Sequence, residues 1–176
     1  MHQGEDAAEH RANGTNGQTQ STDASLSNGK PVTKSVSFID YEYATPSPAA
    51  FDIANHFAEW AGYECDYTMV PTQTHRRNFI SEYMRTYIEM TGEDLDHAAE
   101  TQKLYDEVDI FRGVPGFYWG IWALIQAMIS EIDFDYATYA ESRLGEYWDH
   151  KAETDGSRAA SGREMPLRER TWASEA

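Results

Sequence analysis

One uncharged run of residues limits the folds open to this sequence. The run is GFYWGIWALIQAMI, residues 116–129, and its apolar side chains surround a helix almost completely. It is shorter than the roughly 20 residues that a helix needs to span a bilayer, and Gln126 lies inside it. A helix that is apolar nearly all round is expected to be buried on several sides. The sequence therefore predicts a buried core helix from about Phe117 to Ile132 inside a helical domain.

The other elements follow from apolar residues at helical spacing and from the residues that begin and end helices. Further helices are expected at about residues 48–61, 72–91, 98–111 and 136–151, with a loop at 63–71 and a break at 113–116. The first helix is expected to begin at Pro48 and to stop at Gly62, and the second to follow Thr72 and to stop at Gly92. Val36 and Phe38 alternate with polar residues, which predicts a short strand at 35–40. A lone strand is not stable, so its partner lies in the N-terminal segment or in a sheet that this chain does not fully contain. The fold class is mainly α with a short β element at its start.

Composition divides the chain into three parts. Residues 1–35 have almost no large apolar side chain, so they cannot bury enough surface to offset their chain entropy. Residues 153–176 are similar, and Gly156, Gly162 and Pro166 interrupt any helix there. We therefore expect disorder in both terminal segments and a folded domain over residues 36–152.

The charge and the cysteine content exclude several classes of function. A formal net charge of −16 disfavours nucleic acid and anionic membrane surfaces as partners, because both need a basic footprint. It suits a cationic ligand, and equally well solubility alone. Cys65 is the only cysteine, so no intramolecular disulfide and no cysteine-based zinc site can form. A single thiol and the lack of a signal-peptide pattern lead us to expect a cytoplasmic protein without membrane insertion.

Acidic residues occur in two patterns that could carry chemistry. Asp40 and Glu42 stand two residues apart at the end of the expected strand, so their carboxylates would share one face and could hold Mg²⁺ with bound phosphates. The alternative is an acidic turn in solvent. Asp52, Asn55, His56 and Glu59 form one polar stripe on the first helix. This stripe is either a plain solvent face or the lining of a polar pocket. Asp, Asn and His form helices weakly and are unusual on a plain solvent face, so their presence favours the polar pocket.

Aromatic residues form a third set. Trp119 and Trp122 are three residues apart on one helix, and Tyr139 lies on the next helix. Aromatic faces attract ammonium groups by about 0.5 to 2 kcal/mol, although such rings more often pack in a core. The sequence contains no Gly-rich phosphate loop, no G-x-S-x-G and no H-E-x-x-H.

Three stretches of the sequence together resemble the choline/ethanolamine kinase family. They are VSFIDYEYATPSPAAFDIANHFAEW at 36–60, CDY at 65–67 and FYWGIWALIQAMISEIDFDYATYA at 117–140, and the resemblance extends to about Lys151. WALIQA followed by IDFDYATYA is more similar to ethanolamine kinases than to choline kinases.

The resemblance implies a protein-kinase-like fold with two lobes, of which this chain contains the C-terminal lobe. It implies transfer of the γ-phosphoryl group of ATP, with Mg²⁺, to the hydroxyl of a small amino alcohol. Phosphorylation of ethanolamine is the first step of phosphatidylethanolamine synthesis by the CDP-ethanolamine route. In this family pattern Asp40 matches the acid that holds Mg²⁺ and the nucleotide phosphates, and Glu42 matches a second acid at that site. Asp52 and Glu59 match acids at the cationic end of the substrate pocket. The aromatic wall of this substrate pocket is matched by Tyr67, Trp119, Trp122 and Tyr139.

Two family features do not occur in these 176 residues: the ATP-binding lobe and the catalytic loop H-N-D-x-x-x-x-N. We therefore interpret the chain as a fragment, a truncated gene model or a shortened paralogue, and expect it to be inactive alone. The alternatives are a choline kinase, or a non-catalytic pseudokinase lobe that acts as a binding module for a partner such as a full-length kinase. A second copy in a homodimer and the missing lobe are the other partners expected. A helical scaffold with no ligand would require the motif matches to be accidental. An ATP-binding lobe encoded in frame upstream of this sequence would favour the interpretation as an enzyme.

Overall fold

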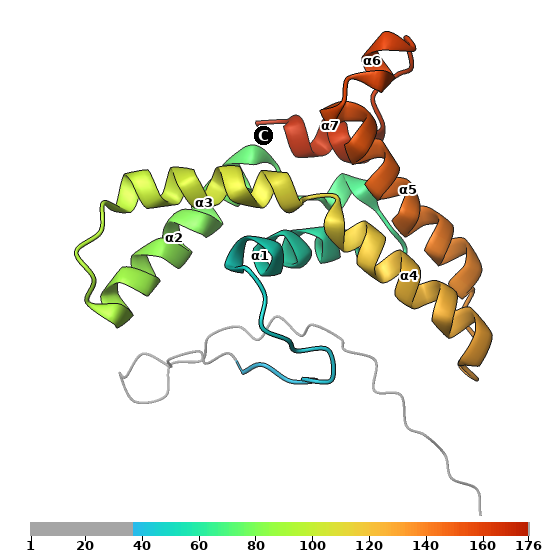
Figure 1. Cartoon of the computed structure of the whole chain (residues 1–176), viewed down its shortest axis with the longest axis horizontal. Coiled ribbons are helices and arrows are strands. Elements are labelled where there is room, and N and C mark those ends of the chain that lie inside the picture. The colour runs from blue at the N-terminus through green and yellow to red at the C-terminus, as the bar shows by residue number, and fades with distance from the viewer. Residues whose placement is uncertain (1–36, 176) are drawn as a thin grey trace, which may run out of the picture. The chain divides into compact units, whose positions relative to one another are not determined.

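The computed structural model describes residues 37–175 (Figure 1). The chain divides into two units, Met1–Ala44 and Thr45–Ala176, and the helices of the second unit confirm a mainly helical fold. They are α1 (Ala49–Ala58), α2 (Gln73–Thr91), α3 (His97–Phe111), α4 (Val114–Ile129), α5 (Tyr136–Thr154), α6 (Ser157–Ala160) and α7 (Leu167–Ala173). Two short 3₁₀ turns, η1 (Glu59–Ala61) and η2 (Tyr67–Met69), lie between α1 and α2. The loop expected at 63–71 therefore contains η2.

The helix ends agree with the residues that predicted them. Helix α1 begins directly after Pro48, and its continuation η1 ends at Gly62 with φ 64°. Helix α2 follows Thr72 and ends at Gly92 with φ 70°. Glycine is favoured at both ends because a left-handed φ costs it little. The predicted stops at Gly62 and Gly92 are confirmed.

Helix α1 supplies one side of the main core. Its buried residues Ile53 and Phe57 pack in one cluster with Ile80 of α2 and with Leu104 and Val108 of α3. The polar stripe lies on the remaining face of α1. The apolar side of this helix thus holds the unit together and leaves the other side for polar contacts.

Helices α4 and α5 lie side by side and pack along their length (Figure 1). Two glycines of α4 allow this close approach. A Cβ at Gly116 would lie 2.6 Å from the carbonyl oxygen of Arg143, and one at Gly120 would lie 2.7 Å from Cγ of Leu144. Both distances are shorter than a carbon atom tolerates, so the spacing of α4 and α5 depends on these glycines.

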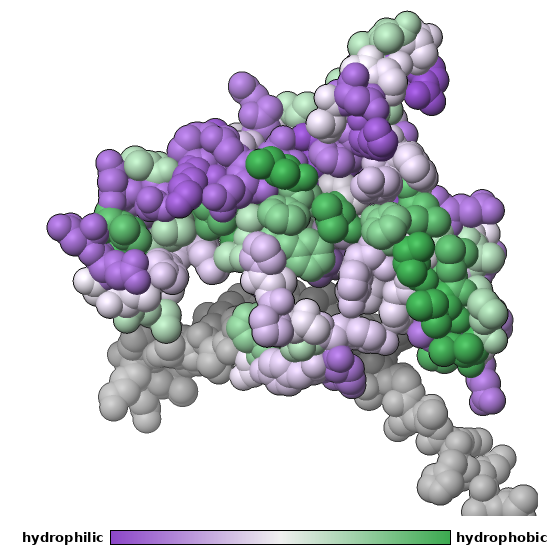
Figure 2. All heavy atoms as spheres, viewed as in Figure 1, coloured by the Kyte–Doolittle hydropathy of each residue, from purple (hydrophilic) through white to green (hydrophobic). Residues whose placement is uncertain are grey.

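Two expectations about the apolar run need correction. The break expected at 113–116 is confined to Arg112 and Gly113, because α4 already begins at Val114 with Pro115 in its first turn, where a proline without an N–H is tolerated. The helix is also not buried on several sides, since its buried residues Pro115, Gly116, Gly120 and Ala123 lie on one face. Met128 is 86% exposed, and Phe117, Ile121, Leu124, Ile125 and Ile129 are exposed as well. Figure 2 shows the resulting apolar patch over α4. Among the described residues, no helix combines the length and the apolar character needed to cross a membrane.

The C-terminal segment differs from the expectation of disorder. Residues 157–160 and 167–173 form α6 and α7, and Trp172 of α7 is 3% exposed within the main core. The guanidinium of Arg76 lies 3.8 Å from the centre of the Trp172 ring, and the indole N–H donates to Asp109 at 2.7 Å. The composition of this segment suggested a tail, but one buried tryptophan anchors it. The disorder expected for residues 1–35 lies outside the described residues.

The described part of the first unit, residues 37–44, has no strand. Asp40 has a left-handed φ of 61°, which aspartate tolerates better than most residues. The amide of Ala44 donates to the carbonyl of Tyr41 at 3.0 Å, so a turn follows. The strand expected at 35–40 is therefore wrong for residues 37–40, and residues 35 and 36 lie outside the described part.

We predict that Gly116→Ala lowers the free energy of unfolding by about 1–3 kcal/mol, because the new methyl group meets the α5 backbone. Gly145→Ala is the matched control on α5. It has nothing within 4 Å of its new Cβ and is expected to stabilise the protein by about 0.5–1 kcal/mol. Urea denaturation followed by circular dichroism measures both. Equal stability of the two variants would contradict the close approach of α4 and α5.

We also predict that Trp172→Ala lowers the free energy of unfolding by about 3–5 kcal/mol, as expected for a buried tryptophan. The control is Trp148→Ala on α5. Trp148 is 59% exposed, so its replacement should change stability by no more than about 0.5 kcal/mol. The same denaturation experiment applies. A Trp172 variant as stable as the control would show that α7 does not pack on the core.

Candidate functional site

The polar stripe of α1 makes a specific contact with the aromatic helix α4. The indole N–H of Trp119 donates a hydrogen bond of 2.7 Å to Oδ1 of Asn55. Both residues are partly buried. The stripe is thus more than a solvent face, because one of its members sets the orientation of a tryptophan ring.

Glu59 makes the second contact of the stripe. Its Oε1 accepts a hydrogen bond of 3.0 Å from Nη2 of Arg143 on α5. Arg143 is fully buried, whereas the side chain of Glu59 is 43% exposed. The guanidinium carbon of Arg143 also lies 5.8 Å from the centre of the Tyr139 ring. One buried cation therefore holds the predicted carboxylate Glu59 and the predicted aromatic residue Tyr139 in the same neighbourhood.

The aromatic residues form a continuous row of edge-to-face contacts from α4 to α5. Trp119 and Trp122 have ring centres 5.7 Å apart at 81°, and Trp122 is followed by Tyr136 at 5.8 Å. Phe134 then contacts both Tyr136 at 4.9 Å and Tyr139 at 5.6 Å. Trp119, Trp122 and Tyr139 are only partly buried. These rings therefore pack against one another without being sealed in the core, which is what a cation-binding wall requires.

Tyr67 joins this neighbourhood from η2. Its hydroxyl donates to the backbone carbonyl of Ser142 on α5 at 3.4 Å. Burial, followed by the charge of Glu146, raises the pKa of Tyr67 well above its usual range. Burial likewise raises the pKa of Tyr139 and of the Cys65 thiol. These groups stay neutral near pH 7, so Tyr139 keeps a hydroxyl donor while the hydroxyl of Tyr67 is used by the Ser142 carbonyl.

Two members of the stripe are placed differently. His56 accepts a hydrogen bond of 3.3 Å from the indole N–H of Trp60 and stacks on Phe79 of α2 at 5.0 Å. It therefore faces α2 and away from the row of aromatic rings. Asp52 is exposed on α1, three residues before Asn55. Its role at the substrate pocket stays a prediction.

The acidic pair of the first unit is exposed. Asp40 has a left-handed φ and Glu42 lies in the following turn, so the expectation that a strand places both carboxylates on one face is wrong. Within residues 37–175, no group of three or more metal-binding side chains is present. Mg²⁺ is commonly held by one or two carboxylates together with phosphate oxygens. Asp40 and Glu42 fit that donor type, and their role as a metal site stays a prediction.

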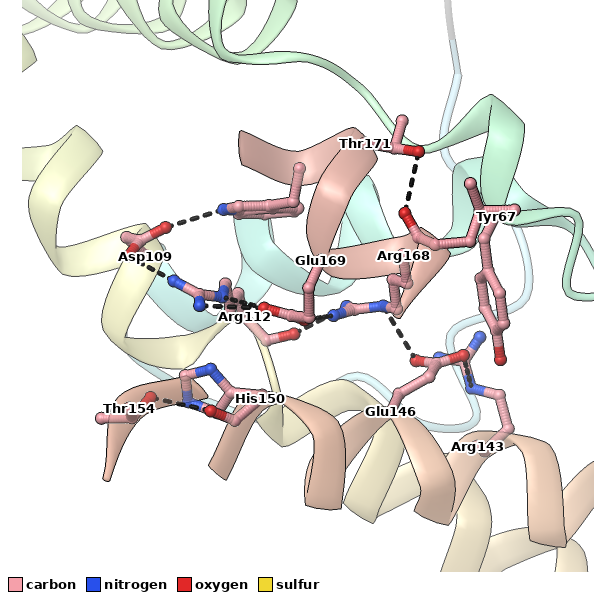
Figure 3. Close-up of polar contacts among 12 residues, drawn as sticks. Tyr67, Asp109, Arg112, Arg143, Glu146, His150, Thr154, Arg168, Glu169 and Thr171 are labelled. Atoms are coloured by element: carbon pink, nitrogen blue, oxygen red, sulfur yellow. Dashed lines mark hydrogen bonds and ion pairs between the residues drawn. The ribbon is translucent and has the colours of Figure 1, made fainter. Parts of the chain in front are cut away.

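The sequence reasoning missed a chain of alternating charges beneath the site (Figure 3). From Glu59 it passes to Arg143, then Glu146, Arg168, Glu169, Arg112 and Asp109. Glu146 lies between Nε of Arg143 at 3.6 Å and Nε of Arg168 at 3.5 Å, and neither of its buried oxygens accepts a hydrogen bond within the described residues. Desolvation raises the pKa of Glu146, while the two guanidinium groups act to lower it.

One sequence signal could have revealed this chain of charges. Arg143 and Glu146 share the inward stripe of α5 with Tyr136, Tyr139 and Ala140. Charged residues on an otherwise apolar stripe have to be paired when the helix packs, because an isolated buried charge is costly. The stripe thus indicated a buried ion pair, but its partners on α7 and η1 are far away in the sequence.

Comparison with known proteins identifies the family to which this chain is similar. The family model described as choline/ethanolamine kinase matches residues 26–148. A probable ethanolamine kinase of Nematostella vectensis is 47% identical over 117 residues, covering 65% of this chain and 34% of the relative. Ethanolamine kinase 1 of Mus musculus is 39% identical over 120 residues, covering 67% and 33%. Probable choline kinase 3 of Arabidopsis thaliana is 34% identical over 123 residues, covering 66% and 34%.

The chain spans about a third of the length of the curated relatives it matches. The matched region contains α1 with its polar stripe, the row of aromatic rings on α4 and α5, and the buried Arg143 and Glu146. With the family model matching well over half of its residues, this chain belongs to the choline/ethanolamine kinase family.

Proposed function

We propose that this chain is the alcohol-binding part of an ethanolamine kinase, which transfers the γ-phosphoryl group of ATP to ethanolamine and forms phosphoethanolamine. The observation that carries this proposal is the hydrogen bond between Trp119 and Asn55. It joins the polar face of α1 to the row of aromatic rings. The same face presents Glu59, so aromatic rings and a partly exposed carboxylate occur on adjoining elements.

An ammonium group suits this combination. Aromatic faces attract a cation by about 0.5–2 kcal/mol, and more strongly where water is excluded. The partly buried rings of Trp119, Trp122 and Tyr139 provide such faces, and Glu59 provides the opposite charge. Asp52 is proposed as a further acid at this end. The net charge of −16 favours the approach of a cation.

Residues of the first unit are proposed to bind the phosphate groups of ATP. Asp40 would hold Mg²⁺ with the phosphates of ATP, and Glu42 would support it. Bound Mg²⁺ neutralises charge on the transferred phosphoryl group. The residues of this chain would orient the alcohol, because phosphoryl transfer depends mainly on positioning and charge neutralisation. The single cysteine suits a reducing compartment such as the cytoplasm.

Choline is the second candidate substrate. Relatives named as choline kinases match over nearly the same share of the chain as those named ethanolamine kinases. The two alcohols differ in their ammonium groups: ethanolamine can donate N–H hydrogen bonds, whereas choline carries methyl groups. Relative affinity for the two alcohols therefore distinguishes the candidates directly.

We predict that the purified chain binds ethanolamine or choline weakly, in the millimolar range. Trp122→Leu should lower the affinity about 2- to 30-fold, because it removes a cation–π interaction of about 0.5–2 kcal/mol. Trp148→Leu is the control, because Trp148 is an exposed tryptophan of α5 outside the row of aromatic rings. Isothermal titration calorimetry measures the affinities. The absence of binding of both alcohols, or equal affinities for the two variants, would contradict the proposed pocket.

We also predict that the chain alone does not phosphorylate ethanolamine. Its 176 residues contain neither a phosphate-binding glycine loop nor the H-N-D-x-x-x-x-N loop that supplies the base. Formation of phosphoethanolamine from ATP is measured with and without Mg²⁺, against a blank without protein. Turnover clearly above the blank would refute this prediction and would show that the chain itself has a nucleotide site.

A further inference from the structure

Arg143 has no role in the reaction proposed so far, although it donates a hydrogen bond to Glu59, the carboxylate proposed to bind the ammonium group. We propose that Arg143 is a positioning residue that holds Glu59 in the orientation that receives the ammonium group. The inference rests on the proposed function and adds a residue to it. It assigns Arg143 no direct contact with the alcohol.

The burial of Arg143 is the first argument. A fully buried guanidinium is costly unless it is paired and hydrogen-bonded. Within the described residues its Nε and Nη1 make no hydrogen bond, and Glu146 lies 3.6 Å from Nε. Among residues 37–175, the guanidinium donates one hydrogen bond, from Nη2 to Oε1 of Glu59 at 3.0 Å. Burial of the Arg143 guanidinium is costly, and its shorter polar contact is the one with the exposed carboxylate of Glu59.

The geometry of Glu59 is the second argument. Glu59 begins η1, so its backbone is set by the end of α1. Its Oε1 accepts the hydrogen bond from the buried Arg143, while the side chain remains 43% exposed to solvent. A free glutamate side chain loses substantial rotamer entropy when a ligand orders it. Anchoring one oxygen in advance leaves the carboxylate pre-organised for a cation, and pre-organisation raises affinity.

The charge balance is the third argument, because a guanidinium beside the carboxylate could weaken the attraction for ammonium. Glu146 offsets this effect. It is 2% exposed and lies on another side of the same guanidinium, so two carboxylates flank one cation. Glu146 also interacts with Arg168 of α7 at 3.5 Å, so its attraction is shared between two guanidinium groups and Arg143 stays available to Glu59. Arg143 can therefore hold Glu59 while the proposed ammonium site keeps a net negative charge.

A double-mutant cycle tests the inference on the full chain. The variants are Glu59→Gln, Arg143→Met and the combination of both. Binding of ethanolamine and of choline is followed by NMR through the indole N–H signals of Trp119 and Trp122, a method that detects weak binding. We expect each single change to lower the affinity about tenfold or more, as for loss of a hydrogen bond to a charged group. The double variant should bind no more weakly than Glu59→Gln alone.

Two further variants separate positioning from stability. Arg143→Met leaves Glu146 with one fewer cation, so Arg143→Met combined with Glu146→Gln removes both charges and tests binding in case the first variant does not fold. It should show the same loss of affinity. Arg76→Met is the matched control, because Arg76 is a buried arginine that bonds to the carbonyls of Pro71 and Trp172 and not to Glu59. It should lower the stability and leave the affinity unchanged.

The outcomes are distinct. A wild-type chain that binds neither alcohol refutes the proposed function, and the inference falls with it. A wild-type chain that binds, with affinity unchanged in Arg143→Met, refutes the inference alone. The inference is also refuted if Arg143→Met lowers the affinity as much in the Glu59→Gln background as in the wild type. Partial recovery in Arg143→Lys, which keeps the charge and one donor, supports it.

Discussion

The chain of alternating charges is the constraint on which the helical unit most depends. It begins at Glu59 on η1 and ends at Asp109 on α3, and four of its inner members are buried: Arg143, Glu146, Arg168 and Glu169. Buried ion pairs contribute little net stability, because desolvation offsets their attraction. Removal of one partner is nevertheless severe, since the other charge is left uncompensated. The chain therefore acts less as a source of stability than as a requirement that η1, α3, α5 and α7 take one mutual arrangement.

This arrangement connects the core to the proposed site. Gly116 and Gly120 bring α4 close to α5, which places Trp122 of α4 in contact with Tyr136. The hydrogen bond from Trp119 to Asn55 then ties α4 to α1. Since Glu59 follows directly on α1, the aromatic rings and the carboxylate are set by the same packing that forms the unit. Packing and the proposed binding surface thus share residues and cannot vary independently.

Local patterns predicted much of the fold, and they failed where long-range contacts decide. The stops at Gly62 and Gly92 and the start after Thr72 follow from backbone chemistry within a few residues. The break expected at 113–116 was too long because Pro115 fits the first turn of a helix as well as it fits a loop. Burial of α4 on several sides was wrong because hydrophobicity shows what a helix can bury and not what is available to cover it. The final segment was missed since composition averages hide one anchored tryptophan.

The site shows the same division. Asn55, Glu59, Trp119, Trp122 and Tyr139 could be named from spacing and residue type, because helical periodicity puts the first two on one face and the tryptophans on another. The contact between these faces, and the buried partners Arg143, Glu146 and Arg168, could not be named in this way.

By itself, the sequence determined the family, the boundaries of α1, α2 and α3 and the residue types of the proposed site, since helix ends and shared helix faces depend on neighbours within one or two turns. Only the tertiary structure decided which cation holds Glu59, which face of α4 stays exposed and whether the last residues fold. The physical reason is that these outcomes depend on pairs of groups from distant elements, whose desolvation and pairing are settled only when the helices meet.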